Sequence, residues 1–178
     1  MEIVKANGLN PLLRILQSPD HDAILTAVSC IVNLTLQPTN DSPIIEAGFL
    51  QPLVALLAFK DNEGTQLYAA GALSNLAASS VMNKRAVVDA GAVQSIKELI
   101  LEVSVNIQLE MTACIRNLSH SGMHSLFNRL LQSHPPTDEL KGRLSEMGIS
   151  EVLFPLTHSP NREVRLRSDA TLQNLRNK

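Results

Sequence analysis

The side chains with the clearest capacity for chemistry are four asparagines that recur within similar apolar segments. The segments read IVNLT, LSNLA, IRNLS and LQNLR. A carboxamide carries two donor hydrogens and an acceptor oxygen, so each asparagine can bind both the N–H and the C=O of a peptide backbone. The same groups can instead bond to nearby main chain and only shape a helix, and both roles can hold for one residue. The four positions are Asn33, Asn75, Asn117 and Asn174.

Other residues with catalytic or metal-binding potential do not form a recognisable site in the sequence. His120 and His124 are four residues apart, which suits a metal site only if a helix continues through Gly122. No carboxylate lies beside them at ligand spacing, so we expect solvated histidines. The sequence also lacks a phosphate-binding loop, a dinucleotide fingerprint and a nucleophile elbow. We therefore predict a protein that is not an enzyme, with no catalytic residue, metal site or cofactor.

Each asparagine must be positioned by a helix, and the segment around Asn75 shows this most clearly. Small and aliphatic residues follow a helical step from Thr65 to Ser79 and cover nearly every side. A helix that is apolar almost all round is buried on more than one side. The pattern therefore predicts a buried helix over 65–79, with Asn75 set among apolar neighbours.

The spacing of the asparagines indicates a repeat protein. Successive positions are separated by 42, 42 and 57 residues. A glycine recurs once in each unit, after a short helix and before a second apolar helix. Glycine can adopt the left-handed backbone conformation that turns the chain sharply at this point. A period of about 42 residues is typical of units built from two or three helices. The marker glycines are Gly8, Gly48, Gly91 and Gly148.

The longer third spacing places an insertion at 121–137, before the fourth unit. Residues 123–131 carry an amphipathic helix pattern, which must fold back onto the repeats or meet a partner, and we favour folding back. The chain starts inside a first helix, at Glu2 or earlier. We expect a piece of a longer array whose uncapped end promotes self-association.

Composition limits the class of protein. The 178 residues are 44% hydrophobic and 3% aromatic, which suits a core of packed helices, and a net charge of −2 gives no argument for nucleic acid. No apolar run reaches the roughly 18 residues of a membrane span, and Glu2 excludes N-myristoylation of this stretch. Cys30 and Cys114 lie two repeats apart, which indicates two buried thiols in a reducing compartment. We expect a cytoplasmic chain without direct membrane insertion.

The repeated units resemble armadillo repeats. The glycine, an aliphatic residue, a Pro-Leu second helix and an A-x-x-x-L-x-N-L third helix match that pattern. The resemblance implies an all-α fold, a right-handed armadillo superhelix of about four three-helix repeats. It would form a single domain over 1–178, with an insertion at 121–137 and units of about 1–38, 39–80, 81–120 and 138–178.

Within that family, the segment from Ala47 to Cys114 is similar to the later repeats of the fungal armadillo proteins of vacuole inheritance. The segment from Ile149 to Val164 resembles the end of those proteins. The resemblance implies a protein-binding scaffold or adaptor in organelle tethering, vacuole inheritance or autophagy. It also implies a place at the cytosolic face of the vacuole membrane, through a lipidated segment that this chain lacks.

In an armadillo superhelix the third helices line a concave groove. The resemblance implies that the four asparagines lie in that groove. There they would hold an extended protein segment while flanking residues supply selectivity. Import receptors of this fold have Trp four residues before the asparagine, whereas this chain has Ser29, Gly71, Ala113 and Ala170, so import-signal binding is disfavoured.

Two further rows of residues flank the asparagines. Seven residues earlier stand Thr26, Tyr68, Glu110 and Arg167, and we select Tyr68 and Arg167 as ligand-binding candidates. Immediately before Asn117 stands Arg116, at a position where family members often have Arg. We expect an acidic or phosphorylated ligand towards that end of the groove. The alternative is a structural module that forms a homo-oligomer through exposed repeat ends or the 121–137 insertion.

Overall fold

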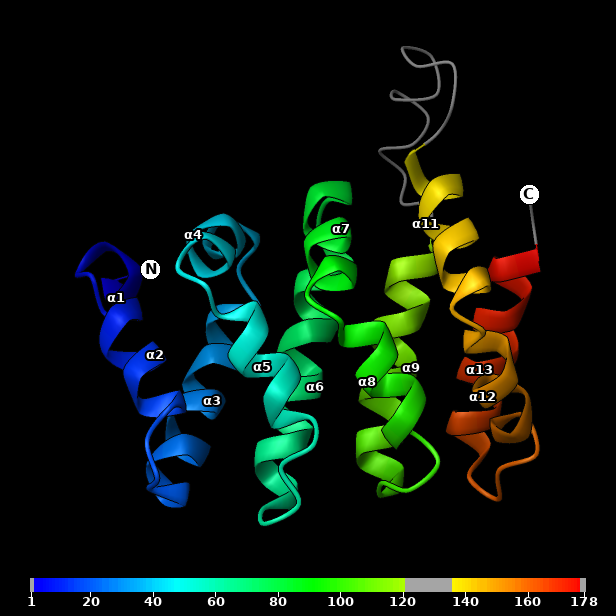
Figure 1. The fold of residues 1–178 in the computed structure, drawn as a ribbon, viewed down its shortest axis with the longest axis horizontal. Helices are drawn as coiled ribbons and strands as arrows, with labels where there is room; N and C mark the ends of the chain where they lie inside the picture. The colour runs from blue at the N-terminus through cyan, green and yellow to red at the C-terminus, as the bar shows by residue number, and fades with distance from the viewer. Residues whose placement is uncertain (1, 121–135, 177–178) are drawn as a thin grey trace.

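The computed structural model describes residues 2–120 and 136–176, and these residues form helices without any strand. The predicted all-α class is confirmed. Four groups of helices stand side by side from the N-terminus to the C-terminus (Figure 1). The groups are α1 (Glu2–Lys5), α2 (Leu9–Leu16) and α3 (His21–Leu34); α4 (Asp41–Glu46), α5 (Leu50–Leu56) and α6 (Glu63–Ala78); α7 (Val81–Asp89), α8 (Ala92–Leu99) and α9 (Val105–Ser119); and α11 (Pro136–Glu146), α12 (Ile149–Leu156) and α13 (Arg162–Arg176). A short 3₁₀ turn, η1 (Pro38–Asn40), precedes α4.

The polar turns of the sequence begin the third helices. The side chain of Asp20 accepts hydrogen bonds from the main-chain N–H groups of Asp22 and Ala23, at 3.1 and 3.0 Å. Asn62 caps α6 in the same way through the N–H of Thr65, at 3.0 Å. Such caps satisfy donors that a helix leaves unpaired at its start. They fix where α3 and α6 begin, whereas Ser104 before α9 makes no such side-chain bond. Helix α6 starts within two residues of the predicted segment.

The turn between the first and second helices uses a left-handed residue in every unit, although not always the predicted one. Gly48, Gly91 and Gly148 have φ angles of +88°, +87° and +69°. In the first unit Gly8 has φ −70°, and the preceding Asn7 takes the left-handed conformation at φ +57°. The prediction for Gly8 is therefore wrong. Asparagine tolerates this conformation better than other side-chain-bearing residues, so Asn7 can make the turn.

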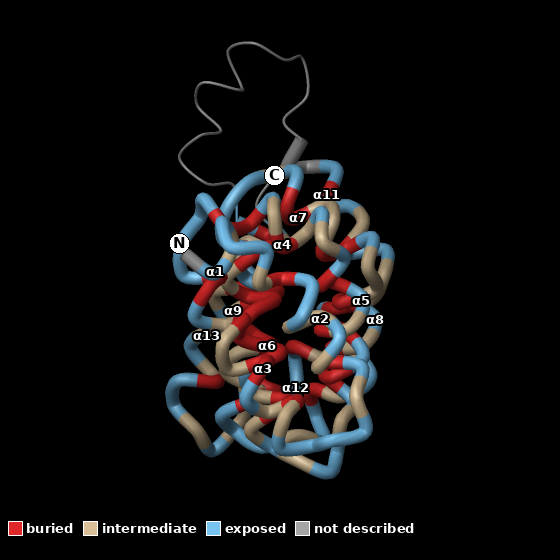
Figure 2. Tube along the Cα trace, turned by 90° about the vertical axis from the view of Figure 1, so that its left-hand side faces the viewer, coloured by how far each residue is buried: buried red, intermediate tan, exposed pale blue. Residues whose placement is uncertain are grey.

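The third helices form the inner layer of the solenoid. Figure 2 shows α3, α6, α9 and α13 on one side and α2, α5 and α8 on the other, with buried residues between them. Helix α6 is covered on nearly all sides, with Leu73 and Leu76 fully buried. Its alanines at 69, 70, 72 and 77 are also buried, so neighbouring helices approach closely. The prediction of a buried helix around Asn75 is confirmed.

The fourth unit is joined to the third by ion pairs between their first helices. Arg143 of α11 pairs with Asp89 of α7 at 2.7 Å, and Arg85 of α7 pairs with Glu139 of α11 at 2.5 Å. Most of the predicted insertion lies outside the described residues, including the amphipathic pattern and its expected folding back. Within the described part of the chain, no helix combines the length and hydrophobicity needed to cross a lipid bilayer.

Candidate functional site

Two of the predicted asparagines link their own third helix to the third helix of the preceding unit. The side-chain nitrogen of Asn117 donates to the main-chain carbonyl of Ser74, at 2.9 Å. The side-chain nitrogen of Asn75 donates to the hydroxyl of Thr35, at 3.1 Å, and lies 3.5 Å from the carbonyl of Val32. Val32 and Ser74 each stand one residue before an asparagine of the row. The sequence missed these partners because they lie in another repeat.

The other two asparagines differ in their surroundings. Asn33 is exposed, and its side-chain nitrogen donates to the carbonyl of Ser29 in its own helix, at 2.8 Å. Asn174 is half-buried on α13, and within residues 2–120 and 136–176 its side chain makes no bond to α9 that corresponds to those of Asn75 and Asn117. The amide nitrogen therefore has a structural role in three of these residues: within the helix for Asn33, and between repeats for Asn75 and Asn117.

A ligand could bind the hydrogen-bonding groups of these carboxamides that the contacts between repeats leave unused. The amide nitrogens of Asn75 and Asn117 each bond to two acceptors in the preceding repeat, whereas their side-chain oxygens can still accept and have no partner among the described residues. Asn75 and Asn117 are only partly buried. They can therefore shape the repeat and still offer an acceptor oxygen to the N–H groups of an extended backbone.

Gly71, at the position where import receptors place Trp, has a packing reason to remain glycine. A Cβ atom there would lie 3.3 Å from Cγ2 of Val32, which is tight for a van der Waals contact. Helix α3 therefore approaches α6 closely at this point. The second predicted candidate on α6, Tyr68, lies one turn earlier and is 37% exposed.

Glu110 completes this part of the surface, although the sequence did not single it out. Its Oε2 atom lies 3.8 Å from the point where a Cβ of Gly71 would stand. Glu110 is partly buried on α9, two helical turns before Asn117. Its position in the same row as Tyr68 is the signal that could have identified it.

The two predicted arginines have different environments. Arg116 is exposed in the last turn of α9. Arg167 is held at two points: its Nε donates to Glu163 at 2.9 Å, and its Nη1 donates to the carbonyl of Leu109 at 3.1 Å. Arg167 therefore joins α13 to α9, and fewer of its N–H groups remain for a ligand.

Buried ionisable groups lie away from this surface. Lys84 of α7 donates to the carbonyl of His120 at 2.5 Å, and its burial lowers the pKa of the ammonium to about 8. Burial raises the pKa of Asp41, an effect that hydrogen bonds from Ser79 and Asn83 oppose. Lys84 thus joins α7 to the end of α9 within the third unit, whereas Asp41 accepts a hydrogen bond from Asn83 across the second and third units.

The cysteines do not provide a reactive thiolate. Burial, together with the negative charge of Glu110, raises the pKa of Cys114 to about 12. Cys114 is fully buried, as expected, whereas Cys30 is only partly buried, so the prediction of two buried thiols is wrong for Cys30. A thiol must ionise to act as a nucleophile, so Cys114 is inert near neutral pH.

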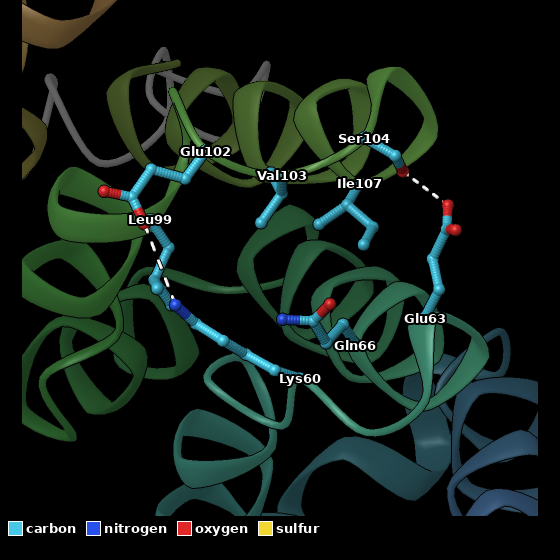
Figure 3. Close-up of a pocket in the computed structure, with 8 residues that line it drawn as sticks. All are labelled: Lys60, Glu63, Gln66, Leu99, Glu102, Val103, Ser104 and Ile107. Atoms are coloured by element: carbon cyan, nitrogen blue, oxygen red, sulfur yellow. Dashed lines mark hydrogen bonds and ion pairs between the residues drawn. The ribbon is translucent and has the colours of Figure 1, made fainter.

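A cavity of about 280 Å³ lies where the turn before α6 meets the turn before α9 (Figure 3). Its charged groups are paired across the two repeats: Lys60 lies 3.9 Å from Glu102, and Ser104 donates to Glu63 at 2.5 Å. The cavity therefore lies at the interface between the second and third units. His124 lies outside the described residues, and among those described no group of three or more His, Cys, Asp or Glu side chains could hold a metal ion.

Known proteins resemble this chain in sequence and in structure. The model of the Armadillo/beta-catenin-like repeat family matches residues 1–36, 39–78 and 80–120. The chain is 48% identical to Vacuolar protein 8 of Yarrowia lipolytica over 178 residues, which is 100% of this chain and 28% of that protein. The chain thus spans less than a third of the length of this relative.

Two solved structures of designed proteins have the same architecture. A designed armadillo repeat protein superposes with a TM-score of 0.81 and 28% identity, covering 97% of this chain and 66% of that one. Another, solved in complex with the peptide (KR)4, has a TM-score of 0.66 and 23% identity, covering 98% of this chain and 84% of that one.

Proposed function

Because this chain belongs to the Armadillo/beta-catenin-like repeat family, we propose that it is a non-enzymatic scaffold that holds an extended segment of a partner protein along its third helices. The predicted armadillo superhelix is confirmed by the matching designed protein. We divide it into units of about 1–38, 39–80, 81–120 and 138–178. The partner segment would lie along α3, α6, α9 and α13, which carry the asparagine row.

The observation that carries this proposal is the unused side-chain oxygen of Asn75 and of Asn117. Each amide nitrogen donates to two acceptors of the preceding repeat, and each side-chain oxygen, on a partly exposed residue, accepts no hydrogen bond from the described residues and can accept one from a ligand. Backbone groups of an extended peptide present donors and acceptors at regular intervals, so a regular row of carboxamides can bind them without reading side chains. Tyr68 and Arg116 would then supply selectivity beside the row, Arg116 towards acidic or phosphorylated side chains.

The similarity to Vacuolar protein 8 supports a role linked to the vacuole. We propose organelle tethering, vacuole inheritance or autophagy, at the cytosolic face of the vacuole membrane and with attachment through a lipidated segment of a longer protein. A designed armadillo protein that binds the peptide (KR)4 supports groove binding of an extended segment.

The test is a binding assay with the double variant Asn75→Ala and Asn117→Ala. The chain would be immobilised and incubated with fungal cytosol, and retained proteins would be identified by mass spectrometry. We expect specific partners to be lost from the double variant and kept by Asn10→Ala, which removes an exposed asparagine from α2. Helical circular dichroism must be the same for all three proteins. Unchanged partner retention by the folded double variant contradicts the proposal.

A structural self-assembly role is the second candidate, and exposed apolar side chains in the last unit favour it. Phe154 of α12 and Leu166 of α13 are 58% and 51% exposed. Burying them against a second copy would remove apolar surface from water. Sedimentation of the wild type and of the variant with Phe154→Ser and Leu166→Ser tests this. A concentration-dependent oligomer that the variant loses supports self-assembly, and a wild-type monomer at high concentration rejects it.

A further inference from the structure

The cavity between the second and third units combines apolar walls with one buried amide. Leu99, Val103 and Ile107 line it with hydrocarbon, and the carboxamide of Gln66 lies among the lining residues (Figure 3). Gln66 is only 7% exposed, and its side-chain nitrogen donates to the carbonyl of Leu57 at 2.8 Å. Its side-chain oxygen accepts no hydrogen bond from the described residues. The cavity therefore contains a buried acceptor that lacks a donor.

The turn between α8 and α9 exposes apolar side chains beside the cavity. Leu101 and Val105 stand two residues on either side of Val103, and they are 51% and 39% exposed. Exposed apolar side chains around a cavity favour contact with another protein, whose anchor side chain fills the cavity. The cavity volume of about 280 Å³ is just below the range of roughly 300–1,000 Å³ for small-molecule pockets, so it suits a single side chain.

Carboxylates outnumber cations around this cavity. Glu63 and Glu102 line it together with Lys60. Asp61 follows Lys60 in the chain, and its only ion pair among the described residues is with His21, at 4.0 Å. Lys60 and Glu102 are 3.9 Å apart and largely exposed, so their attraction is weak. A ligand carboxylate or phosphate would therefore meet an excess of negative charge.

We propose that this cavity binds the side chain of an unphosphorylated tyrosine from a partner protein. The ring would lie between Val103 and Ile107, and the phenol hydroxyl would donate to the side-chain oxygen of Gln66. Tyrosine combines an apolar ring with a donor at its end, which matches these walls and this acceptor. Phenylalanine would leave the buried oxygen unpaired, and the phosphate of phosphotyrosine would face the surrounding carboxylates.

This site is separate from the asparagine row and goes beyond the proposed function. Gln66 precedes Asn75 by nine residues on α6, a rise of about 13 Å along the helix. Gln66 bonds to Leu57 at the end of α5, whereas Asn75 bonds to Thr35 at the end of α3. The two sites therefore face different neighbours of α6, and either can be lost without the other.

The test titrates the isotope-labelled chain with four peptides and follows its NMR spectrum. The peptides are acetyl-Ser-Val-X-Val-Ser-amide, where X is tyrosine, phenylalanine, alanine or phosphotyrosine. We expect the tyrosine peptide to shift the side-chain amide resonances of Gln66 and the methyl resonances of Val103. The phenylalanine peptide should bind about fivefold more weakly, for the loss of one hydrogen bond, and the alanine peptide about tenfold more weakly. The phosphotyrosine peptide should bind more weakly than the tyrosine peptide.

Two variants add the same bulk at half-buried valines. Val103→Trp fills the cavity and should abolish binding of the tyrosine peptide, whereas Val81→Trp on α7 changes a valine outside the cavity and should leave it unchanged. Circular dichroism must show that both variants are folded. The double variant Asn75→Ala and Asn117→Ala should bind the tyrosine peptide like the wild type, even if it loses its groove partners.

Several results would overturn the tyrosine site, and the first of them use the wild-type chain alone. They are equal or tighter binding of the phenylalanine, alanine or phosphotyrosine peptide, peptide-induced shifts that spare Gln66 and Val103, and absence of binding at millimolar concentration. Undiminished binding of the tyrosine peptide by folded Val103→Trp would also overturn it. Failure of the groove assay with the asparagine variant rejects the proposed function and leaves this site standing.

Discussion

The side-chain amide of Asn117 donates a hydrogen bond to the main-chain carbonyl of Ser74, 2.9 Å away and 43 residues earlier in the chain. One asparagine thereby connects two adjacent repeats at the surface where a partner is expected to bind. In a solenoid, stability depends on contacts between nearest neighbours. The row of asparagines therefore contributes to the fold as well as to the proposed binding surface.

The first prediction is that Asn117→Ala destabilises the protein more than Asn33→Ala. Loss of the Asn117 bond should lower the free energy of unfolding by about 1 kcal/mol. Asn33 is exposed and bonds only within its own helix, so its replacement should cost less than about 0.5 kcal/mol. Urea denaturation followed by circular dichroism measures both values. Equal losses of the free energy of unfolding would mean that the bond to Ser74 does not stabilise the contact between the two repeats.

A second prediction contrasts two glycines. Gly91→Ala should destabilise the protein by about 1 kcal/mol, because Gly91 has φ +87° and a side chain is strained there. Gly142 lies within α11, and a Cβ at that position meets nothing within 4 Å. Gly142→Ala should therefore stabilise the protein, by up to about 1 kcal/mol.

The thermal midpoints of the two glycine variants should move in opposite directions from that of the wild type. Each variant serves as a control for the other, because both substitutions add the same methyl group. Apart from the chain neighbours and the backbone of the glycine's own helix, no atom of the described residues lies within 4 Å of the added Cβ in either case, so backbone conformation distinguishes the two variants. A stabilising Gly91→Ala would contradict the assigned role of that turn.

The third prediction concerns the pH dependence caused by Lys84. Burial lowers its pKa from 10.5 to about 8, so between these values the unfolded chain binds more protons at this residue than the folded protein. The free energy of unfolding therefore rises with pH in this window, by about 1 kcal/mol between pH 8 and 9. Lys84→Met should abolish that rise. Urea titrations at both pH values test it, and an unchanged slope in the variant rejects the assignment.

The fourth prediction has the opposite sign and concerns Cys114. Its pKa is raised from 9.0 to about 12, so above pH 9 the folded protein keeps a proton that the unfolded chain loses. The free energy of unfolding should fall by about 2 kcal/mol as pH rises from 9 to about 10.5. Removing the thiol in Cys114→Ala should remove this contribution. Cys30→Ala serves as the control, because it removes the other thiol and keeps Cys114, so the fall should remain.

Much of the local structure follows from sequence because its causes are local. Alternating polar turns and apolar helical segments predict α6 within two residues at its start, and the Asn62 cap explains that start. The first unit differs because Asn7, next to Gly8, can also adopt a left-handed conformation. Sequence shows that both residues suit the turn but does not select between them.

The candidate site was harder to predict because its contacts cross repeats. Tyr68 and Arg116 are exposed, which suits their predicted roles, and those roles stay predictions. Arg167 bonds to Leu109, 58 residues earlier, so α13 uses part of its side chain for packing. Glu110 becomes notable only because the superhelix places it beside Gly71.

The sequence by itself determined the repeat period, the helical class and the register of the four asparagines. These features depend on helical periodicity and turn chemistry, which act over a few residues. Only the tertiary structure decided that the amide nitrogens of Asn75 and Asn117 bond to the preceding repeat and that Glu110 of α9 lies beside the buried Gly71 of α6. Those contacts depend on how consecutive repeats stack, since side-chain bonds require partners within about 3 Å, however far apart they lie in the chain.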